Sequence, residues 1–240
     1  MINYHFFGKE FNSNLSKVED FLKENYQSNI KLCYLKQIHS NIVIEATPNQ
    51  IFEGDALISN QKNIALLIVT ADCAPILIYD KTNNNIAAIH AGWRGAKAKI
   101  IDNSIKNLIK LGSNPCNLKA IIGPMIGQKN YEIDQNFYQD FLTEDKNNQK
   151  FFQKNRENHY LFDLKSYIKS QLNFLKITDI IDVNIDTFAN NNFYSYRRAS
   201  QNNQPQKMRN FSLMVRKNYK HLKQELTVSK DKAATSLDKD

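Results

Sequence analysis

The sequence contains few cysteines and no long hydrophobic run, and both shortages narrow the class of protein. Its 240 residues include three cysteines, Cys33, Cys73 and Cys116, which lie far apart in the chain. An odd, sparse set excludes a disulfide framework, so we expect reduced thiols. No apolar run approaches the roughly 20 residues that span a bilayer, and the first residues lack the pattern of a secretory signal. We therefore expect a cytoplasmic protein with no membrane partner.

A dense basic patch is also missing, although the net charge is +8. The lysines are scattered among asparagines without interleaved aromatic residues, unlike a surface that binds nucleic acid. No internal repeat and no linker divides the chain. We expect no nucleic-acid partner, one domain over residues 1–217, and a polar, disordered tail over residues 218–240. The sequence leaves open whether the protein is a monomer or a small homo-oligomer.

The chain does contain a mixture of apolar strands and amphipathic helices, which predicts an α/β fold of layered mixed β-sheets with flanking helices in a single domain. Nearly continuous apolar runs predict strands covered on both faces at residues 64–70, 75–79 and 86–90. Further strands are expected at residues 1–10 (an edge), 30–35, 42–46, 55–59, 118–122, 179–188 and 211–215. Helices are expected at residues 14–26, 96–111 (ended by Gly112), 134–142 and 163–175 (capped by Asp163). Residues 143–159 are predicted to be a surface excursion, and residues 190–198 a loop that leads into a short strand.

Three side chains that commonly bind metals lie where predicted strands meet loops. They are His39, Cys73 and His90, separated by 34 and 17 positions. Histidine and cysteine are the standard ligands of zinc, and three protein ligands with an open fourth position are typical of a catalytic zinc site. The spacings match no zinc finger. The alternative is therefore a buried cysteine and two loop histidines with ordinary hydrogen bonds.

Charged groups beside these residues are candidates for catalysis. Asp72, next to the cysteine, could orient a ligand histidine or act as a general base; the alternative is an Asx-turn before Pro75. The glycine-rich residues 91–96 (AGWRGA) predict an anion site, to which Arg94 would add a charge-assisted hydrogen bond. The same residues could instead form only a tight connection. Trp93 either stacks on an aromatic substrate or packs in the core.

A second candidate substrate-binding segment is FYSYRR at residues 193–198. Its tyrosines could contact a base, and its arginines could bind phosphate or carboxylate. These residues are Tyr194, Tyr196, Arg197 and Arg198. The alternative is an exposed edge strand with solvated charges. Arg209 is another candidate of this kind, and Gly123–Pro124 ends a predicted strand in a second candidate rim loop.

Taken together, these strings resemble the bacterial laccase-domain family. The resemblance rests on TADCAPILIYD followed by AAIHAGWRGAKAKII, with KQIHS, GDALIS, IGPMIGQKNYEI and FYSYRR around them, and it covers residues 6–216. Members have been described as polyphenol oxidoreductases, as peptidoglycan-editing factors, and as purine nucleoside phosphorylases with adenosine deaminase activity. The resemblance implies a zinc site at His39, Cys73 and His90, a cytoplasmic location, and a fold similar to that of deamidating toxins that use a Cys–His pair.

The chain departs from the family pattern at two places. Family members often carry a cysteine where this chain has Asp186, before Thr187. The arginine pair is usually followed by a TGR-like element, for which Arg209 is the candidate counterpart.

The residues and the resemblance together favour a zinc-dependent purine nucleoside phosphorylase. Its expected substrates are phosphate with adenosine, inosine or methylthioadenosine, and adenosine deaminase activity is expected as well. Asp72 and Arg94 are the expected catalytic residues, and Arg197 and Arg198 the expected substrate-binding residues.

Three alternatives remain open from the sequence. Cys73 activated by His90 would make a hydrolase or amidase in the editing of peptidoglycan precursors. Copper-dependent phenol oxidation is the second, because blue-copper sites also use two histidines and a cysteine. A multicopper oxidase, however, needs more than the five histidines present. A non-catalytic binding protein stabilised by a metal is the third.

Overall fold

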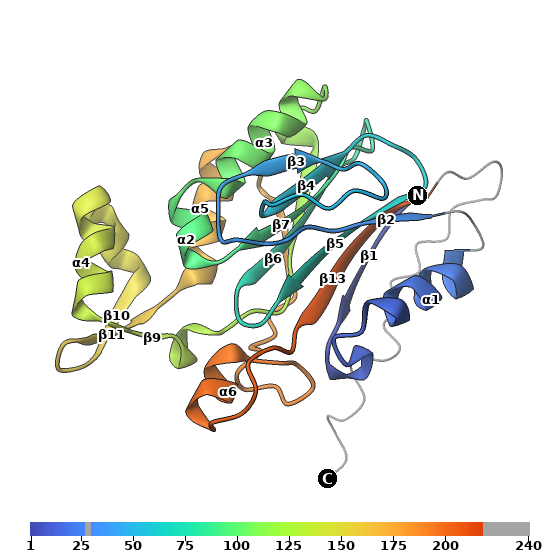
Figure 1. Cartoon of the computed structure of the whole chain (residues 1–240). Coiled ribbons are helices and arrows are strands. Elements are labelled where there is room, and N and C mark those ends of the chain that lie inside the picture. The colour runs from blue at the N-terminus through green and yellow to red at the C-terminus, as the bar shows by residue number, and fades with distance from the viewer. Residues whose placement is uncertain (27–29, 218–240) are drawn as a thin grey trace, which may run out of the picture.

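The strands form three sheets in the computed structural model, which describes residues 1–26 and 30–217 (Figure 1). The predicted tail lies outside the described residues. The six-stranded sheet has the order β12–β8–β6–β7–β4–β3 and the four-stranded sheet the order β1–β13–β5–β2. A small sheet of order β10–β11–β9 lies with α4 at one end of the molecule.

The elements have the following bounds. The strands are β1 (Ile2–Phe7), β2 (Lys31–Cys33), β3 (Val43–Glu45), β4 (Ala56–Ser59), β5 (Ile64–Thr70), β6 (Ala74–Asp80), β7 (Ile86–Ala91), β8 (Leu118–Ile122), β9 (Glu132–Asp134), β10 (Phe152–Arg156), β11 (His159–Phe162), β12 (Asp179–Asp182) and β13 (Asn210–Arg216). The α-helices are α1 (Leu15–Tyr26), α2 (Trp93–Lys97), α3 (Ile100–Lys110), α4 (Gln135–Glu144), α5 (Leu164–Phe174) and α6 (Tyr196–Gln201). Short 3-10 turns lie at η1 (Lys9–Phe11), η2 (Pro115–Asn117), η3 (Gln128–Asn130) and η4 (Lys146–Phe151).

The two large sheets pack face to face because their central strands are apolar on both sides. In β5, Ile64, Leu66 and Ile68 pack against the six-stranded sheet, whereas Ala65 and Leu67 belong to the cluster under α1. This alternation follows from the two-residue period of a strand. The outcome is a layered α/β fold, as the sequence predicts.

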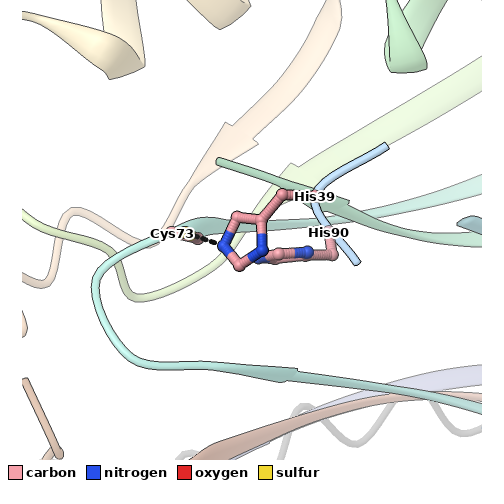
Figure 2. A group of neighbouring side chains, drawn as sticks. All are labelled: His39, Cys73 and His90. Carbon is pink, nitrogen blue, oxygen red and sulfur yellow. Dashed lines mark hydrogen bonds between the residues drawn. The ribbon is translucent and has the colours of Figure 1, made fainter. Parts of the chain in front are cut away.

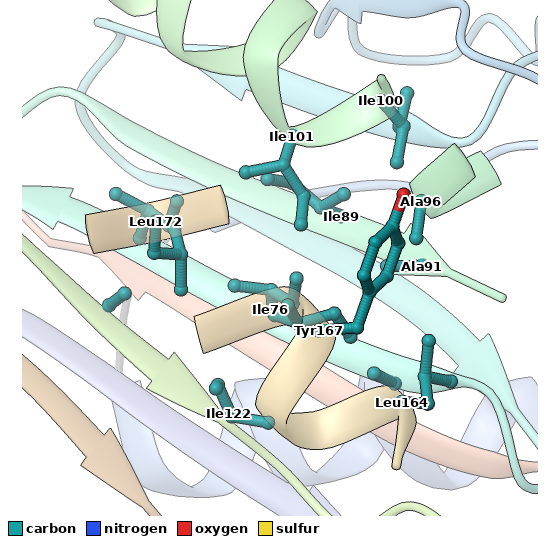
Figure 3. Packing of buried hydrophobic residues seen from close by; sticks show 14 of the residues in the cluster. Ile76, Ile89, Ala91, Ala96, Ile100, Ile101, Ile122, Leu164, Tyr167 and Leu172 are labelled. Atoms are coloured by element: carbon teal, nitrogen blue, oxygen red, sulfur yellow. The ribbon is translucent and has the colours of Figure 1, made fainter. Parts of the chain in front are cut away.

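Helices α3 and α5 cover the outer face of the six-stranded sheet (Figure 3). Fully burying one isoleucine or leucine in such a layer contributes roughly 1.5–3 kcal/mol. Figure 3 shows α3 and α5 side chains meeting those of β6, β7 and β8; these residues are Ile100, Ile101, Leu164, Tyr167, Leu172, Ile76, Ile89 and Ile122. The sheet that carries the site is therefore fixed from both sides.

Most of the predicted elements are confirmed. The apolar strands occupy β5, β6 and β7, and β1 lies at a sheet edge. Asp163 caps α5, since its carboxylate accepts a hydrogen bond from the Ser166 amide. Gly112 follows α3 with φ of 91°, a left-handed conformation that suits glycine.

The predicted helix over residues 96–111 is confirmed as α3, but α3 begins only at Ile100, because the separate helix α2 ends at Lys97. Lys99 interrupts the helix with φ of 68°. The Asn41 side-chain amide donates to the Ala98 carbonyl at 2.9 Å, and the Asn41 carbonyl accepts from Asn103 at 3.0 Å. The Asn41 side chain thus takes the place of a helical amide as the donor to the Ala98 carbonyl. The break lets α2 border the site while α3 packs on the sheet.

The predicted surface excursion at residues 143–159 is confirmed in its exposure, since most of these residues are exposed, but it also contains regular structure. It contains η4, β10 and the start of β11, and its Phe151 is buried. The rings of Phe152 and Phe162 stack at 4.8 Å, and both lie close to the Phe141 ring. These aromatic contacts attach the segment to the core, while most of its other side chains stay polar and exposed.

Two further boundaries differ from the predictions. The strand expected at residues 179–188 ends at Asp182, because its partner β8 ends at Ile122 and Asn184 adopts φ of 55°. Residues 190–198 lead into α6 and not into a strand. The Ser195 side chain caps this helix by accepting from the Arg198 amide at 3.1 Å.

Candidate metal centre and anion cavity

The structure brings His39, Cys73 and His90 together, as the sequence predicts (Figure 2). One possible ligand atom from each residue lies within 4.8 Å of the others. The Cys73 Sγ lies 3.9 Å from the His39 Nε2, and the two imidazole centroids are 4.7 Å apart. Within the described residues, this is the one group of histidine, cysteine and carboxylate side chains with such a geometry.

Strand register explains how these distant residues meet. The antiparallel pairing of β6 and β7 sets Pro75 opposite His90 and Ala74 opposite Ala91. Cys73, just before β6, therefore lies beside Gly92. The pairing of β4 and β7 sets Ala56 opposite Ile89, so that Asp55 lies beside His90. The ladder thus assembles the site from loops that are separate in sequence.

Asp55 holds the two histidines in place. This fully buried carboxylate accepts a 2.7 Å hydrogen bond from the His90 Nδ1 and a 3.0 Å bond from the His39 amide. Ser40 also donates to it through its amide and its hydroxyl. A carboxylate on one ring nitrogen fixes the tautomer and leaves the other nitrogen for a metal. His90 therefore presents its Nε2 to the site.

The charges of the centre are strongly coupled. Burial raises the pKa of the Cys73 thiol, but the hydrogen bonds and charges of His39 and His90 outweigh it and leave a pKa of about 6. Burial lowers the pKa of His90, yet Asp55 and Cys73 raise it to about 9. Burial raises the pKa of Asp55, and its bonds to His90 and Ser40 lower it to about 2. The cysteine is therefore a thiolate at neutral pH, the form that binds metals.

The residues fit a metal ion. For a tetrahedral zinc ion with the usual bond lengths, a nitrogen and a sulfur ligand lie about 3.5 Å apart. The observed 3.9 Å between Cys73 and His39 is close to this value. Gly92 leaves the space that the ligands occupy, since a Cβ there would lie 2.8 Å from the Cys73 Sγ. The glycine of the AGWRG segment thus leaves room for the candidate ligand Cys73.

A cavity of about 820 Å³ opens above the three residues. Its wall combines aromatic rings with groups of both charges. The members used below are Trp93, Arg94, Tyr131, Glu132, Asp134, Phe137, Tyr196, Arg197 and Arg209, with Asp72, Cys73 and the two histidines at the base. The three carboxylates in this wall already have protein donors: Asp72 from Thr187, Ser195 and Arg197, Asp134 from Phe137, and Glu132 from Arg156.

Two of the cavity's arginines have no such partner. Across residues 1–26 and 30–217, the guanidinium groups of Arg94 and Arg197 make no hydrogen bond or ion pair. Each lies over an aromatic ring: Arg94 is 4.4 Å from the Trp93 ring and Arg197 is 5.7 Å from the Tyr131 ring. Their free donors face a cavity whose acids are satisfied, which favours binding of an anion.

The other predicted arginines have protein partners. The Arg198 guanidinium donates to the carbonyls of Thr187, Phe188 and Phe193, and Arg198 does not line the cavity. Arg209 lines the cavity but donates to the carbonyls of Gln206 and Met208. Of the arginine pair in FYSYRR, the structure therefore brings only Arg197 to the centre.

Asp72 links the loop between β5 and β6, which carries Cys73, to α6. It adopts φ of 87°, and its carboxylate accepts hydrogen bonds from the Thr187 hydroxyl, the Ser195 hydroxyl and the Arg197 amide at 2.7–3.0 Å. No hydrogen bond joins it to either histidine within the described residues. The hydrogen bond from the Arg197 amide to Asp72, which is 125 positions earlier in the sequence, fixes the first turn of α6.

Of the aromatic residues predicted to contact substrate, some line the cavity and others do not. Tyr196 lines the cavity and is 50% exposed, whereas the Tyr194 hydroxyl donates to Asn12 away from it. Trp93 packs in the core, as one of its two alternatives predicted, and its stacking on a substrate stays a prediction. Its ring packs 4.7 Å from Phe137 and also borders the cavity. Gly123–Pro124 is outside the main cavity wall.

Asp55 and Tyr131 were missed by the sequence reasoning. GDALIS places an acid directly before a buried strand, which is a signal for a carboxylate at a site. Tyr131 lies within the IGPMIGQKNYEI string of the family resemblance, but no local pattern singles it out, because the residues just before it are polar.

The fold and the site define a layered α/β protein with one candidate His–Cys–His metal centre, within the described residues, at the base of an arginine-bearing cavity. The profile of the family described as multi-copper polyphenol oxidoreductase laccase matches residues 9–217, so this chain belongs to that family.

Relatives and solved structures agree with this assignment. A purine nucleoside phosphorylase of Rickettsia prowazekii is 37% identical over 179 residues, which cover 73% of this chain and 74% of the relative. One from Haemophilus influenzae is 34% identical over 172 residues, covering 70% of this chain and 69% of the relative. A Neisseria meningitidis protein of family DUF152 superposes with a TM-score of 0.75 at 25% identity, covering 85% of this chain and 81% of its own. No helix of the described residues is long and apolar enough to cross a membrane.

Proposed function

We propose that this chain is a zinc-dependent purine nucleoside phosphorylase that acts on adenosine, inosine and methylthioadenosine and also deaminates adenosine. The observation that carries the proposal is that one cavity holds both the metal-ligand trio and two arginines with free donors. Relatives that are named purine nucleoside phosphorylases support it. The proposal places the protein in the cytoplasm as a monomer or small homo-oligomer.

His39, Cys73 and His90 would hold the metal. Bound zinc would act as a Lewis acid and lower the pKa of a coordinated water to near neutrality, which is the chemistry that deamination needs. Two imidazoles and one thiolate suit zinc, and they suit copper as well. The five histidines of the chain are too few for the several copper sites of a multicopper oxidase.

In phosphorolysis, an oxygen of phosphate forms a bond to the ribose C1′ while the bond from C1′ to the purine nitrogen breaks. The electron pair stays on the purine, which takes up a proton from water. The guanidinium groups of Arg94 and Arg197 would bind the phosphate, and their position in the cavity wall supports this role. Trp93, Phe137 and Tyr196 offer aromatic faces for the purine.

The predicted proton-transfer role of Asp72 stays a prediction. Its three hydrogen bonds support a second role, in which Asp72 positions α6 so that Arg197 reaches the cavity. Arg198 supports the same loop through its carbonyl contacts, and we propose no direct contact between Arg198 and substrate.

A hydrolase is the second candidate, because Cys73, His90 and Asp55 form a thiolate–imidazole–carboxylate series. Such a series activates a cysteine nucleophile. Zinc content separates the two candidates, since a thiolate bound to zinc is not free to attack a substrate.

The test incubates purified protein with adenosine, inosine and methylthioadenosine, with and without phosphate, and detects free base and inosine by chromatography. We expect one zinc per chain, base release that depends on phosphate, and inosine from adenosine. Cys73→Ala should lose both zinc and activity, and Cys116→Ala, which removes an exposed thiol, should lose neither. A zinc-loaded sample that produces neither base nor inosine would refute the proposal.

A further inference from the structure

Tyr131 occupies a fixed position in the cavity wall. It follows η3, and its amide donates to the Gln128 carbonyl at 3.1 Å. Its carbonyl accepts from the Phe162 amide at 3.0 Å, and the two rings lie 5.7 Å apart. Backbone and ring are thus held from both sides, so that the direction of the hydroxyl is set by the fold.

The Tyr131 hydroxyl has no hydrogen-bond partner in the part of the chain that the structure describes. Tyrosine hydroxyls in poorly solvated places usually have one. Burial, followed by the negative charge of Cys73, raises the pKa of this phenol well above its usual range. The group therefore keeps its proton at neutral pH and is available as a donor.

Both free arginines lie near this hydroxyl. Arg197 is centred 5.7 Å from the Tyr131 ring, and the charges of Arg197 and Arg94 both act on the phenol. The acids of the cavity wall already accept hydrogen bonds from the protein. Three donors without protein acceptors thus border one space beside Cys73, which is the arrangement that a tetrahedral oxyanion requires.

We propose that the Tyr131 hydroxyl is the third donor of a phosphate site whose other donors are the Arg94 and Arg197 guanidinium groups. The proposal rests on the proposed function, because it identifies how phosphorolysis would position its second substrate. Tyr131 keeps its proton throughout and orients one phosphate oxygen. It is a positioning group for the attacking anion and not an acid.

Trp93 allows the test to be made without catalysis, because it is the only tryptophan in the chain and Arg94 lies 4.4 Å from its ring. Inorganic phosphate is titrated into the zinc-loaded protein at constant ionic strength while tryptophan fluorescence is recorded. A lost hydrogen bond to a charged group corresponds to about tenfold weaker binding or more. We expect this loss for Tyr131→Phe. Tyr138→Phe is the matched control, since Tyr138 stacks on Tyr160 at 4.0 Å and lies outside the cavity wall.

Steady-state kinetics give a second readout. In Tyr131→Phe the KM for phosphate should rise by a similar factor, while the KM for inosine and the zinc content stay unchanged. A melting temperature establishes that the variant is folded. If Tyr131→Phe is not folded, the test uses wild-type protein labelled with 13Cζ-tyrosine. Titrated phosphate should then change the NMR chemical shift of one tyrosine, and the absence of any such change would overturn the proposal.

The outcomes separate the two proposals. Equal phosphate affinity of the wild type and Tyr131→Phe overturns the role of Tyr131, as does a rise confined to the KM for inosine. Phosphate binding that weakens in Tyr131→Phe, in a protein that cleaves no nucleoside, supports the anion site and refutes the phosphorylase.

Discussion

Replacing Gly92 by alanine should weaken metal binding while leaving the metal-free fold intact. The added Cβ would lie 2.8 Å from the Cys73 Sγ and 3.2 Å from the His39 Cδ2. Ordinary contact begins at 3.4 Å, so the sulfur must retreat by at least 0.6 Å. Displacing one ligand of three should weaken zinc binding by about 10- to 100-fold, in the range seen for disturbed ligand orientation.

The fold itself should tolerate this change. Gly92 has φ of −71° and ψ of 169°, a conformation open to alanine. Alanine also restricts the unfolded chain, which stabilises proteins by about 0.4–1 kcal/mol at compatible positions. We therefore expect a free energy of unfolding of the metal-free protein within about 1 kcal/mol of the wild type.

Gly112→Ala is the control, because it should show the opposite pattern. Gly112 has φ of 91° and does not line the cavity, and a Cβ there would make only an ordinary contact with the Asn83 Nδ2 at 3.9 Å. The left-handed conformation costs a non-glycine residue about 1–2 kcal/mol. Urea unfolding of metal-free protein and competition with a chromophoric chelator measure the two effects. Unchanged zinc affinity in Gly92→Ala would refute the placement of Cys73 as a ligand.

The remaining predictions concern pH, the arginine pair and the aromatic cluster. In metal-free protein, Asp55 has a lowered pKa, so the stability that it contributes is lost as pH falls from 3.8 to about 2. His90 has a raised pKa, so the stability that it contributes is lost as pH rises from 6.5 to about 9. Urea unfolding midpoints that stay constant across either pH range would contradict these two contributions. Zinc affinity should rise over the same upper window, because zinc must displace the His90 proton, and a flat chelator-competition profile would argue against His90 as a ligand. Arg197→Ala should weaken phosphate binding and leave the melting temperature unchanged. Arg198→Ala should cost about 1–3 kcal/mol of stability, because the carbonyls that Arg198 contacts lose their hydrogen-bond donor. Equal melting temperatures of the two variants would contradict these different roles. Phe162→Ala should cost about 3–5 kcal/mol in urea unfolding, and a loss under 1 kcal/mol would show that this ring cluster does not attach residues 143–159 to the core.

The strands with continuous apolar character and the amphipathic helices could be predicted from local patterns. Ile64–Thr70 and its two neighbours have one dominant arrangement, because strands of this kind must be covered on both faces. The boundaries that failed depend on partners far along the chain. Asn41 contacts the residues on both sides of the break at Lys99, and α6 begins where Asp72 accepts a hydrogen bond from the Arg197 amide. No local pattern contains those partners.

The sequence by itself determined the layered α/β class, and it predicted a metal centre at His39, Cys73 and His90 through the family resemblance. Only the tertiary structure decided which charged groups are free to act. Arg197 and Arg198 are adjacent and chemically equal, yet one faces the cavity and the other holds carbonyls. The physical reason is that a hydrogen-bonding group is available to a ligand only if the fold leaves it without a partner, and partners are set by contacts across the whole chain.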